Sequence, residues 1–381
     1  RGRHPRGPRV NPLRAEISLD AIRHNVALIR DLADGADVCA VVKADAYGHG
    51  AVDVAAAALD AGATWLAVAT PAEAIGVGGA VHADTPMLLL SEPDPVVLAH
   101  AWPELPSGIR FTAASEVGVA ALTALGGAPT RVHMKIDTGM HRVGVAPADA
   151  VTLASSIADA PALQLEGSWT HCAVADEPDD PFTAEQLRRF DAALAAVLGA
   201  LAARGIQPPM THVANSAGAI AHPTARRDMV RLGIAMYGVP PSPTLAGAVN
   251  LRPALRLVST VTGLRTVEPG ESVSYGRRWT AERSTRIATV PAGYADGIRR
   301  SSGAAGVEVL IGGRRRPIVG TVTMDQLMVV VDDHVELGDE VVLIGRQGDE
   351  EVTATEIADR LGTIGYEVLT DLGPRVERDL R

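Results

Sequence analysis

The chain has 381 residues, a length that suggests two domains, and 47% of them are hydrophobic, which is ample for a large core. The formal net charge of -10 argues against nucleic-acid binding, because no basic surplus is present to neutralise phosphates. No apolar run approaches the roughly 18 residues of a membrane-spanning helix, and the two cysteines, Cys39 and Cys172, make no disulfide framework. We therefore expect a protein of a reducing compartment, the cytoplasm, with no membrane or nucleic-acid partner.

The first residues form a basic arm that is rich in proline and glycine. Residues 1–9 lack the apolar segment of a secretory signal, and we expect a disordered arm over residues 1–12. A short strand is expected at 16–19, followed by a helix that carries Ile22, Val26 and Ile29 on one face.

Apolar strands then alternate with alanine-rich helical stretches. The strands are expected near residues 38–42, 65–69, 86–90, 108–111, 131–136, 163–169, 210–213 and 229–234. Thr70-Pro71-Ala72-Glu73 and Thr183-Ala184-Glu185-Gln186 have the pattern of capping boxes, and Gly205 is expected to end the second helix. Eight such repeats predict an α/β fold, a (β/α)8 TIM-type barrel over residues 13–243. A doubly wound open sheet is the alternative. The barrel requires catalytic residues at the C-terminal ends of the strands.

The pattern changes after Tyr237. Val239-Pro240-Pro241-Ser242-Pro243 cannot extend a helix and indicates a linker. Strands are expected at 256–267, 285–290, 307–311, 317–322, 327–331 and 340–344, with a hairpin turn at Gly312-Gly313. One helix is expected at 353–361, begun by Thr353 and Glu356 and ended by Gly362. Residues 244–381 are thus predicted to form a mainly β domain.

One lysine stands at the end of a predicted core strand, in the stretch Val41-Val42-Lys43-Ala44-Asp45-Ala46-Tyr47-Gly48-His49-Gly50. Lysine is seldom buried without a partner. A desolvated lysine loses its charge readily, and a neutral amine can form a Schiff base with a carbonyl compound. The alternative is a lysine whose amine reaches solvent from the strand end.

Four further strand ends carry polar residues. They are Lys135 to Gly144, Trp169 to Asp176, His212 to Gly218 and Val230 to Gly238. A buried polar group without a partner costs about 1–3 kcal/mol, so together these stretches indicate a ligand site or one polar network. Asn215-Ser216-Ala217-Gly218 suits an anion such as phosphate, although Ser216 could equally cap a helix. Gly233 would let a phosphate approach the backbone.

These motifs together resemble the alanine racemase family, from Glu16 to about Asp371. The resemblance implies that Lys43 carries pyridoxal 5'-phosphate (PLP) and that Arg231 faces the pyridine nitrogen of this cofactor. It implies that Arg142 holds the substrate carboxylate and that Lys135 is a candidate for carbamylation. The other cofactor-binding residues that it implies are Tyr47, His171, Asn215, Ser216, Gly233 and Tyr366, and it implies no metal.

The second domain carries the remaining motifs of the resemblance. Ser274-Tyr275-Gly276 is similar to the segment of the second catalytic base, and Pro291 to Gly297, with Tyr294, to an entrance segment. Thr323-Met324-Asp325-Gln326 is similar to a substrate-contacting turn. In the family these segments enter the site from the other subunit, which implies a homodimer with shared active sites. The sequence departs from many relatives at Thr321, where they have arginine, and at His141, where they have glycine.

The implied reaction is the interconversion of L-alanine and D-alanine by two bases, which supplies D-alanine for peptidoglycan synthesis. Lys43 would serve the D-side proton and Tyr275 the L-side proton. Both residue types have reference pKa values near about 10, which the site must lower. An arginine donates hydrogen bonds and accepts none. Arg231 would therefore keep the pyridine nitrogen unprotonated and limit side reactions.

Three other functions remain open at this point. A PLP-dependent decarboxylase of the same architecture would place a glutamate at the pyridine nitrogen, so Arg231 argues against it. A PLP-carrying binding protein would be a single barrel, so the long β domain argues against it. A racemase that prefers serine or accepts several small amino acids is compatible with the sequence.

Overall fold

The computed structural model describes residues 12–126 and 129–381. The arm predicted over residues 1–12 lies, except for its last residue, outside the described residues. The chain forms two compact units. Among the described residues, the first comprises Asp20–Ala46 and Gly50–Arg252, and the second comprises residues 12–19, Tyr47–His49 and Pro253–Arg381. The domain boundaries proposed from the sequence, at 12/13 and 243/244, stay predictions.

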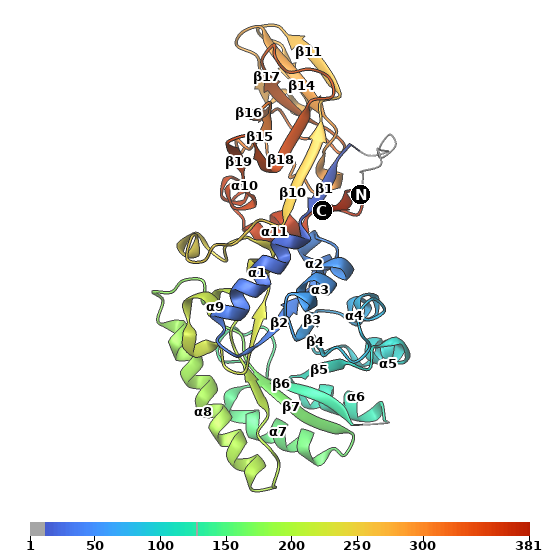
Figure 1. The fold of residues 1–381 in the computed structure, drawn as a ribbon, viewed down its shortest axis with the longest axis vertical. Coiled ribbons are helices and arrows are strands. Elements are labelled where there is room, and N and C mark those ends of the chain that lie inside the picture. Colours follow the sequence, from blue (N-terminus) through green and yellow to red (C-terminus); the bar gives the residue numbers. More distant parts are fainter. Residues whose placement is uncertain (1–11, 127–128) are drawn as a thin grey trace. The chain divides into compact units, whose positions relative to one another are not determined.

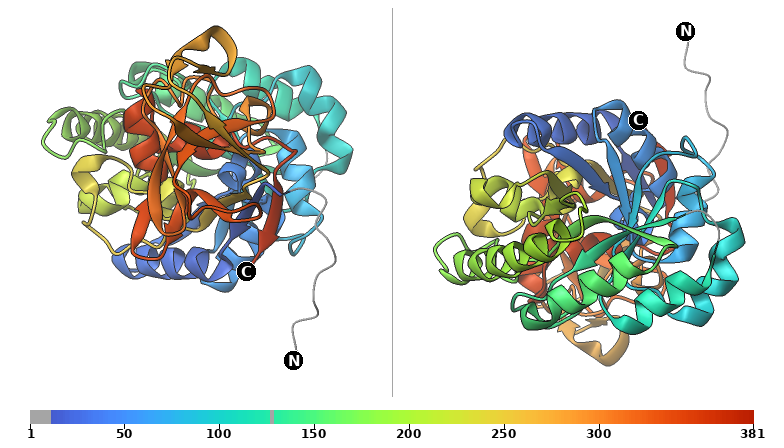
Figure 2. Two further views of the ribbon diagram at one scale, coloured as in Figure 1. Left: turned by 90° about the horizontal axis from the view of Figure 1, so that it is seen from above. Right: turned by 90° about the horizontal axis from the view of Figure 1, so that it is seen from below.

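The first unit is built on an eight-stranded parallel sheet that is almost closed on itself (Figure 2, right). Its strands pair in the order β8-β7-β6-β5-β4-β3-β2-β9, which follows the sequence except that β9 joins β2. Near the gap between β8 and β9, Asp228 N donates to Thr211 O and Arg231 N donates to Ala214 O. The strands are β2 (Asp37–Val41), β3 (Trp65–Val68), β4 (Met87–Leu89), β5 (Ile109–Ala113), β6 (Thr130–Lys135), β7 (Leu163–Trp169), β8 (Met210–His212) and β9 (Met229–Leu232). The predicted barrel is confirmed, and the doubly wound alternative is wrong because its strand order would reverse within the sheet.

The helices of this unit surround the strands (Figure 2). They are α1 (Leu19–Leu32), which begins one residue before this unit, α2 (Lys43–Gly48), which runs into the second unit, α3 (Ala51–Asp60), α4 (Pro71–Gly78), α5 (Pro95–Ala101), α6 (Glu116–Ala124), α7 (Ala150–Asp159), α8 (Phe182–Ala202) and α9 (Ser216–Ala221). The capping box predicted for Thr70 and Glu73 is confirmed at the start of α4. The one predicted for Thr183 is wrong, because α8 already begins at Phe182 and Thr183 is buried inside its first turn. The same helix ends at Ala202, before Gly205.

The second unit is mainly β (Figure 1). Its large sheet has the order β11-β14-β17-β16-β15-β18-β10-β1-β20, with β19 paired to β18, and β12 and β13 form a separate hairpin. The strands are β1 (Arg14–Ile17), β10 (Leu255–Thr260), β11 (Gly263–Val267), β12 (Ser272–Val273), β13 (Trp279–Thr280), β14 (Thr285–Val290), β15 (Glu308–Ile311), β16 (Arg314–Val319), β17 (Leu327–Val331), β18 (Glu340–Gln347), β19 (Glu350–Val352) and β20 (Glu377–Leu380). The N-terminal strand β1 therefore pairs with C-terminal strands, antiparallel to β10 and parallel to β20.

Three local predictions for this unit have clear outcomes. The hairpin turn at Gly312-Gly313 is confirmed, because both residues have positive φ (62° and 70°) between the paired strands β15 and β16. The strand predicted at 256–267 is in fact two strands, β10 and β11. The helix α10 (Ala354–Leu361) is confirmed with its Thr353 cap and Gly362. A second helix, α11 (Gly365–Thr370), was not predicted, because no side chain caps its start.

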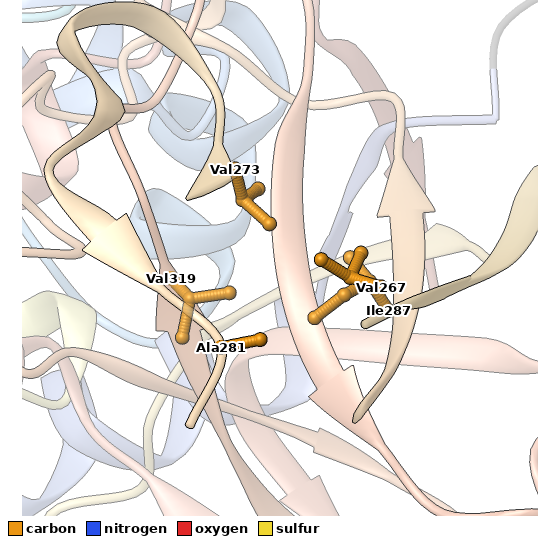
Figure 3. Close-up of a cluster of buried hydrophobic side chains, with 5 residues drawn as sticks. All are labelled: Val267, Val273, Ala281, Ile287 and Val319. Atoms are coloured by element: carbon orange, nitrogen blue, oxygen red, sulfur yellow. The ribbon is translucent and has the colours of Figure 1, made fainter. Parts of the chain in front are cut away.

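A cluster of buried apolar side chains supports one part of the large sheet (Figure 3). It consists of Val267, Val273, Ala281, Ile287 and Val319, with Trp279, Met328 and Val330 packed against it. Because Val273 ends β12, this packing fixes the strand that leads directly into Ser274 and Tyr275.

Two absences concern the described residues. No helix in residues 12–126 and 129–381 is long and apolar enough to cross a membrane. Within the same ranges, no group of three histidine, cysteine, aspartate or glutamate side chains is placed to hold a metal ion.

Candidate active site

Lys43 lies two residues beyond the end of β2 and begins a turn of unusual hand. The four residues that follow, Ala44 to Tyr47, have φ values of 53°, 51°, 52° and 53°, and Gly48 has φ 82°. A left-handed turn costs about 1–2 kcal/mol for each residue other than glycine. Nothing in the residue types of this stretch indicated four consecutive left-handed residues. Such strain is typical of functional sites and must be held by contacts.

Two carboxylates hold the beginning of this turn. Glu73 at the start of α4 accepts from Ala44 N at 2.8 Å through Oε1, and from Ala69 N at 2.7 Å and Thr70 N at 3.1 Å through Oε2. The Asp45 carboxylate accepts from Ala51 N at 2.9 Å. The helix cap of α4 therefore also fixes the backbone immediately after Lys43.

Basic side chains gather around Lys43 at the C-terminal ends of the barrel strands. Burial, with Arg142 next in effect, lowers the pKa of Lys43, and Glu73 opposes the shift. Burial, followed by Arg142 and Arg231, lowers the pKa of Lys135 to about 8. Burial and the same cations hold the pKa of His171 well below its usual value. We call Lys43, Lys135, Arg142, His171 and Arg231 the cation cluster. Its charge suits an anionic ligand, and its lysines are shifted toward the neutral, nucleophilic amine.

Arg231 is the most deeply anchored member of the cation cluster, with 3% of its surface exposed. Its Nη1 donates to His212 Nδ1 at 2.9 Å, and its Nη2 donates to Thr170 O at 2.9 Å and Val213 O at 3.0 Å. The same Nη2 lies 3.3 Å from His171 Nδ1. Within residues 12–126 and 129–381, Nε of Arg231 has no hydrogen-bond acceptor. Burial lowers the pKa of Arg231 to about 10, so the guanidinium is still charged at neutral pH.

One aromatic ring lies close to both buried cations. The Trp169 ring centroid is 4.4 Å from Lys135 Nζ and 4.7 Å from the guanidinium carbon of Arg231. Both distances are within the range of a cation–π interaction. Trp169 therefore stabilises like charges that would otherwise repel each other.

In the predicted phosphate-side loop, the side chains of Asn215 and Ser216 make different hydrogen bonds. Asn215 caps α9, because its side chain accepts from Gly218 N at 2.9 Å. Ser216 Oγ instead accepts from Gly233 N at 2.9 Å and from Ala235 N at 3.3 Å. Since both bonds use the oxygen as an acceptor, the hydroxyl proton of Ser216 remains to be donated to an anion.

Two predicted cofactor residues lie together in the second unit. Tyr47 is buried, and burial raises the pKa of its phenol to about 12. Its ring centroid is 6.2 Å from that of Tyr366 on α11. Gly48 is required beside them, because a Cβ at this position would lie 2.5 Å from Leu369 O.

Tyr275 projects from the second unit with 71% of its surface exposed. Thr321 Oγ1 donates to Tyr275 O at 2.9 Å, and Ser274 Oγ donates to Thr321 O. Thr321, at which the sequence departs from many relatives, thus braces the backbone of the proposed base. A cavity of about 590 Å³ lies beside it, lined in part by Tyr275, Thr323 and Met328.

The other predicted substrate-side residues are also exposed or paired within this unit. Tyr294 is 42% and Met324 52% exposed, and Ala295 N donates to Met324 O. Asp325 accepts from Arg375 Nη1 at 2.9 Å. His141, the second departure from the family pattern, has φ 54°, a conformation that a glycine would adopt without strain.

The structure therefore collects the predicted residues in two groups. The barrel unit holds the cation cluster with Asn215, Ser216 and Gly233, and the second unit holds Tyr47, Tyr275, Tyr294, Met324, Asp325 and Tyr366. Sequence reasoning missed the contact of Glu73 with Ala44, although it predicted the capping box. It also missed His133 and Glu166 behind Arg231, for which the only signal was polar residues inside apolar strands, and it gave no role to His212 within the polar stretch at 212–218.

The barrel carries a nucleophilic lysine and a donor-only arginine in a cationic site. These features define the class of protein, a barrel enzyme that acts on a bound anion. Models of the alanine racemase N-terminal and C-terminal domains match residues 17–241 and 254–380. The chain belongs to the alanine racemase family, and it is accordingly an amino-acid racemase that depends on PLP.

Relatives of known name and structure agree over nearly the whole chain. Alanine racemase of Symbiobacterium thermophilum is 46% identical over 97% of this chain and 97% of its own, and that of Thermobifida fusca is 44% identical over 96% of each. The solved alanine racemase of Streptomyces coelicolor A3(2) has a TM-score of 0.88 at 39% identity and covers 97% of this chain and 98% of its own. Alanine racemase from Bacillus anthracis with bound L-Ala-P has a TM-score of 0.86 at 37% identity, covering 97% of this chain and 95% of its own.

Proposed function

We propose that this chain interconverts L-alanine and D-alanine with PLP as cofactor and with Lys43 and Tyr275 as its two bases. The observation that carries the proposal is the unsatisfied Nε of Arg231 within the cation cluster. The other two nitrogens of this buried guanidinium donate to fixed acceptors, so the N–H of Nε is left for a ligand. The ligand must accept a hydrogen bond at this position, and the surrounding lysines favour a ligand that carries negative charge at another position.

The residues of the barrel unit fit PLP on three grounds. Lys43 has the lowered pKa that a lysine needs to bond covalently to an aldehyde. Ser216 has a hydroxyl proton directed to no described acceptor, which suits a phosphate oxygen. Arg231 Nε suits a bare ring nitrogen. We propose the same cofactor-binding role for Tyr47, His171, Asn215, Gly233 and Tyr366, on the strength of the family resemblance.

Arg231 sets the chemistry that the bound cofactor can supply. PLP, when bound, accepts electron density from a carbon–hydrogen bond that is broken next to the amino group. Arg231 donates a hydrogen bond but does not transfer its proton near neutral pH, because its pKa remains at about 10. The electron sink is therefore weaker than one with a protonated ring nitrogen. This favours return of the proton to the same carbon, which is what racemisation requires.

Each face of the substrate needs its own proton carrier. Lys43 is proposed to take and return the proton on the D-side, because the cation cluster favours its neutral form. Tyr275 is proposed for the L-side. Its phenol is largely exposed, and within the described residues its oxygen contacts no partner. In the family, this tyrosine enters the site of the other subunit, so we propose a homodimer with shared active sites.

The substrate carboxylate needs a cation that is not already paired. Arg142 is exposed, and within the described chain it makes no ion pair. We propose that Arg142 holds the carboxylate and that Tyr294, Met324 and Asp325 contact the substrate from the other subunit, as the family resemblance implies. Lys135 has a pKa near 8, so its neutral amine is available to react with carbon dioxide. The resulting carbamate would carry a negative charge beside Arg142 and would orient it.

The product and location follow from the same assignment. D-alanine would supply peptidoglycan synthesis, as in the family. We propose the cytoplasm as the location, because Cys39 and Cys172 are both buried and free, and burial raises the pKa of each thiol.

The function is tested by incubating the purified chain, loaded with PLP, separately with L-alanine and L-serine and following optical rotation. We expect loss of rotation with L-alanine. Inversion of serine alone would revise the substrate, and inversion of neither with PLP bound would refute the racemase. Borohydride should fix the cofactor to Lys43, and label on Lys135 would overturn the assignment.

Two variants test the division of labour and the dimer. Tyr275→Phe should slow L-to-D conversion more than D-to-L conversion in single turnover, whereas an equal loss would argue against a one-face role. Lys43→Ala and Tyr275→Phe chains, each impaired alone, should regain activity above that of either variant when mixed and refolded together. Absence of recovery despite formation of the heterodimer would refute a shared site.

A further inference from the structure

A chain of hydrogen bonds leads away from Arg231, buried at its two histidines and partly buried at Glu166. Arg231 Nη1 lies 2.9 Å from His212 Nδ1, and His212 Nε2 lies 2.8 Å from His133 Nδ1. His133 Nε2 lies 3.2 Å from Glu166 Oε2, and Arg110 Nε donates to the same oxygen at 3.0 Å. The chain thus joins residues of β9, β8, β6, β7 and β5, and none of its members beyond Arg231 belongs to the cation cluster.

The direction of every bond in this chain is fixed by its two ends. Arginine only donates, so His212 Nδ1 must accept and is unprotonated. A neutral imidazole then carries its proton on Nε2, which donates to His133 Nδ1. By the same rule His133 carries its proton on Nε2 and donates it to the carboxylate of Glu166. The donor end at Arg231 and the acceptor end at Glu166 require the same two tautomers.

This hydrogen-bond chain offers no acceptor for a second proton on either imidazole ring. An imidazolium donates from both nitrogens, so it would set two N–H groups against each other within the chain. The charged groups that face the rings are Arg231, Glu166 and Arg110, and Arg131 lies 3.6 Å from the other Glu166 oxygen. Burial lowers the pKa of both histidines, in agreement with two neutral rings.

The surrounding barrel is shaped to hold the two imidazoles. Both rings are fully buried. Trp169 stacks on His212 at a centroid distance of 5.4 Å and an angle of 15°, and Trp65 meets His133 edge-on at 5.3 Å. Gly167 on β7 leaves the space for His133, because a Cβ there would lie 2.3 Å from His133 Nδ1. That atom is the one that accepts from His212.

We propose that His133 and Glu166 are positioning residues that fix the tautomer of His212 and, through it, the orientation of Arg231 toward the cofactor ring. The cofactor part of this inference rests on the proposed function, whereas the tautomer part does not. Neither residue contacts the site. If the far end lost its acceptor, His212 would be free to place its proton on Nδ1, and that proton would face Nη1 of Arg231. Arg231 would then have to turn, which would misdirect its Nε.

The test compares His133→Leu with His133→Asn in the full-length chain labelled with ring-¹⁵N histidine, with and without PLP. In the unaltered chain we expect His212 to show a bare Nδ1 and a protonated Nε2. His133→Asn should keep this tautomer, because its side-chain oxygen can accept from His212 Nε2. His133→Leu should give mixed tautomers, shift the ¹⁵N signal of labelled PLP at the pyridine nitrogen, and lower kcat/KM by about tenfold, as expected for one buried hydrogen bond.

The outcomes separate this inference from the racemase assignment. A protonated Nδ1 on His212 in the unaltered chain, or identical ¹⁵N spectra for the two variants, would overturn the positioning role. A loss of thermal stability without a change in tautomer would mean that the histidines only fill space. The histidine spectra without PLP keep their meaning even if no racemisation occurs. If His133→Leu fails to fold, Glu166→Gln, which keeps an acceptor oxygen, should retain the tautomer that Glu166→Leu loses.

Discussion

Replacement of Glu73 by alanine should release the strained turn behind Lys43. The carboxylate accepts three backbone N–H groups, of which the one from Ala44 belongs to the left-handed turn. The four left-handed residues cost about 4–8 kcal/mol together, at about 1–2 kcal/mol each. A hydrogen bond to a charged group contributes about 1.5–3 kcal/mol, and the lost capping box about 1 kcal/mol. We therefore expect Glu73→Ala to lower the free energy of unfolding by about 3 kcal/mol.

Urea unfolding measures the loss of stability in Glu73→Ala, and chemical labelling of the Lys43 amine measures the change in its pKa. Glu73 raises the pKa of Lys43, so its removal lowers this pKa further and moves the labelling of Lys43 by a small amine reagent to lower pH. Racemisation should nevertheless fall, because the amine is no longer held in place. Glu73→Gln keeps one acceptor oxygen, so its free energy of unfolding and its turnover should lie between those of the unaltered chain and those of Glu73→Ala.

The matched control is Glu116→Ala, since Glu116 is exposed in the first turn of α6 and its side chain accepts a hydrogen bond from Ser156 Oγ at 2.9 Å. This variant should change the free energy of unfolding by less than about 0.5 kcal/mol, as is usual for surface substitutions. The reasoning fails if Glu73→Ala costs no more than the control, or if it costs more but leaves both the labelling of Lys43 and the turnover unchanged.

Three further predictions concern single residues. Because the pKa of Lys135 is lowered to about 8, the unfolded chain binds more protons than the folded chain between pH 8 and about 10.4. The free energy of unfolding should therefore rise with pH in this window in carbon-dioxide-free buffer, and Lys135→Met should flatten the rise. Gly48→Ala should lower the free energy of unfolding in urea by more than about 2 kcal/mol, because it adds a backbone clash to a positive φ. Gly35→Ala, at a position with φ 93° and open space, should lower it only by the conformational cost of about 1 kcal/mol. Equal costs would argue against the clash. Thr321→Val should lower turnover several-fold without weakening PLP binding, since it removes about 1 kcal/mol of support from the backbone of Tyr275; unchanged single-turnover rates would refute this support.

Local sequence signals were sufficient to predict structures that depend only on residues close together in the sequence. The capping box at Thr70, the helix cap at Thr353 and the Gly312-Gly313 hairpin depend on side chains and φ preferences within four residues, and all three are confirmed. The reciprocal bond of a capping box is formed at Thr70, whereas the Glu356 carboxylate accepts from Arg315 and Arg360. The start of α8 was misplaced at Thr183, because the helix already begins at Phe182, whose N–H donates to the Asp180 side chain at 2.8 Å. The helix α11 was missed because its first turn has no capping side chain to announce it.

The sequence by itself determined the eight barrel strands, the change to a β domain and the strand-end positions of Lys43, Lys135, His171 and Arg231. It could do so because the alternation of apolar and polar residues is a local property of the chain. Its resemblance to alanine racemases supplied the roles of these residues.

Only the tertiary structure decided what surrounds these residues. The acceptor of Ala44 N is Glu73, 29 positions away, and the chain behind Arg231 joins residues as far apart as Arg110 and Arg231. Such contacts depend on which strands become neighbours in the barrel, and no window of sequence contains them. The same holds for pKa shifts, because burial and the proximity of like charges, which lower the pKa of Lys43 and Lys135, arise only when the strand ends converge.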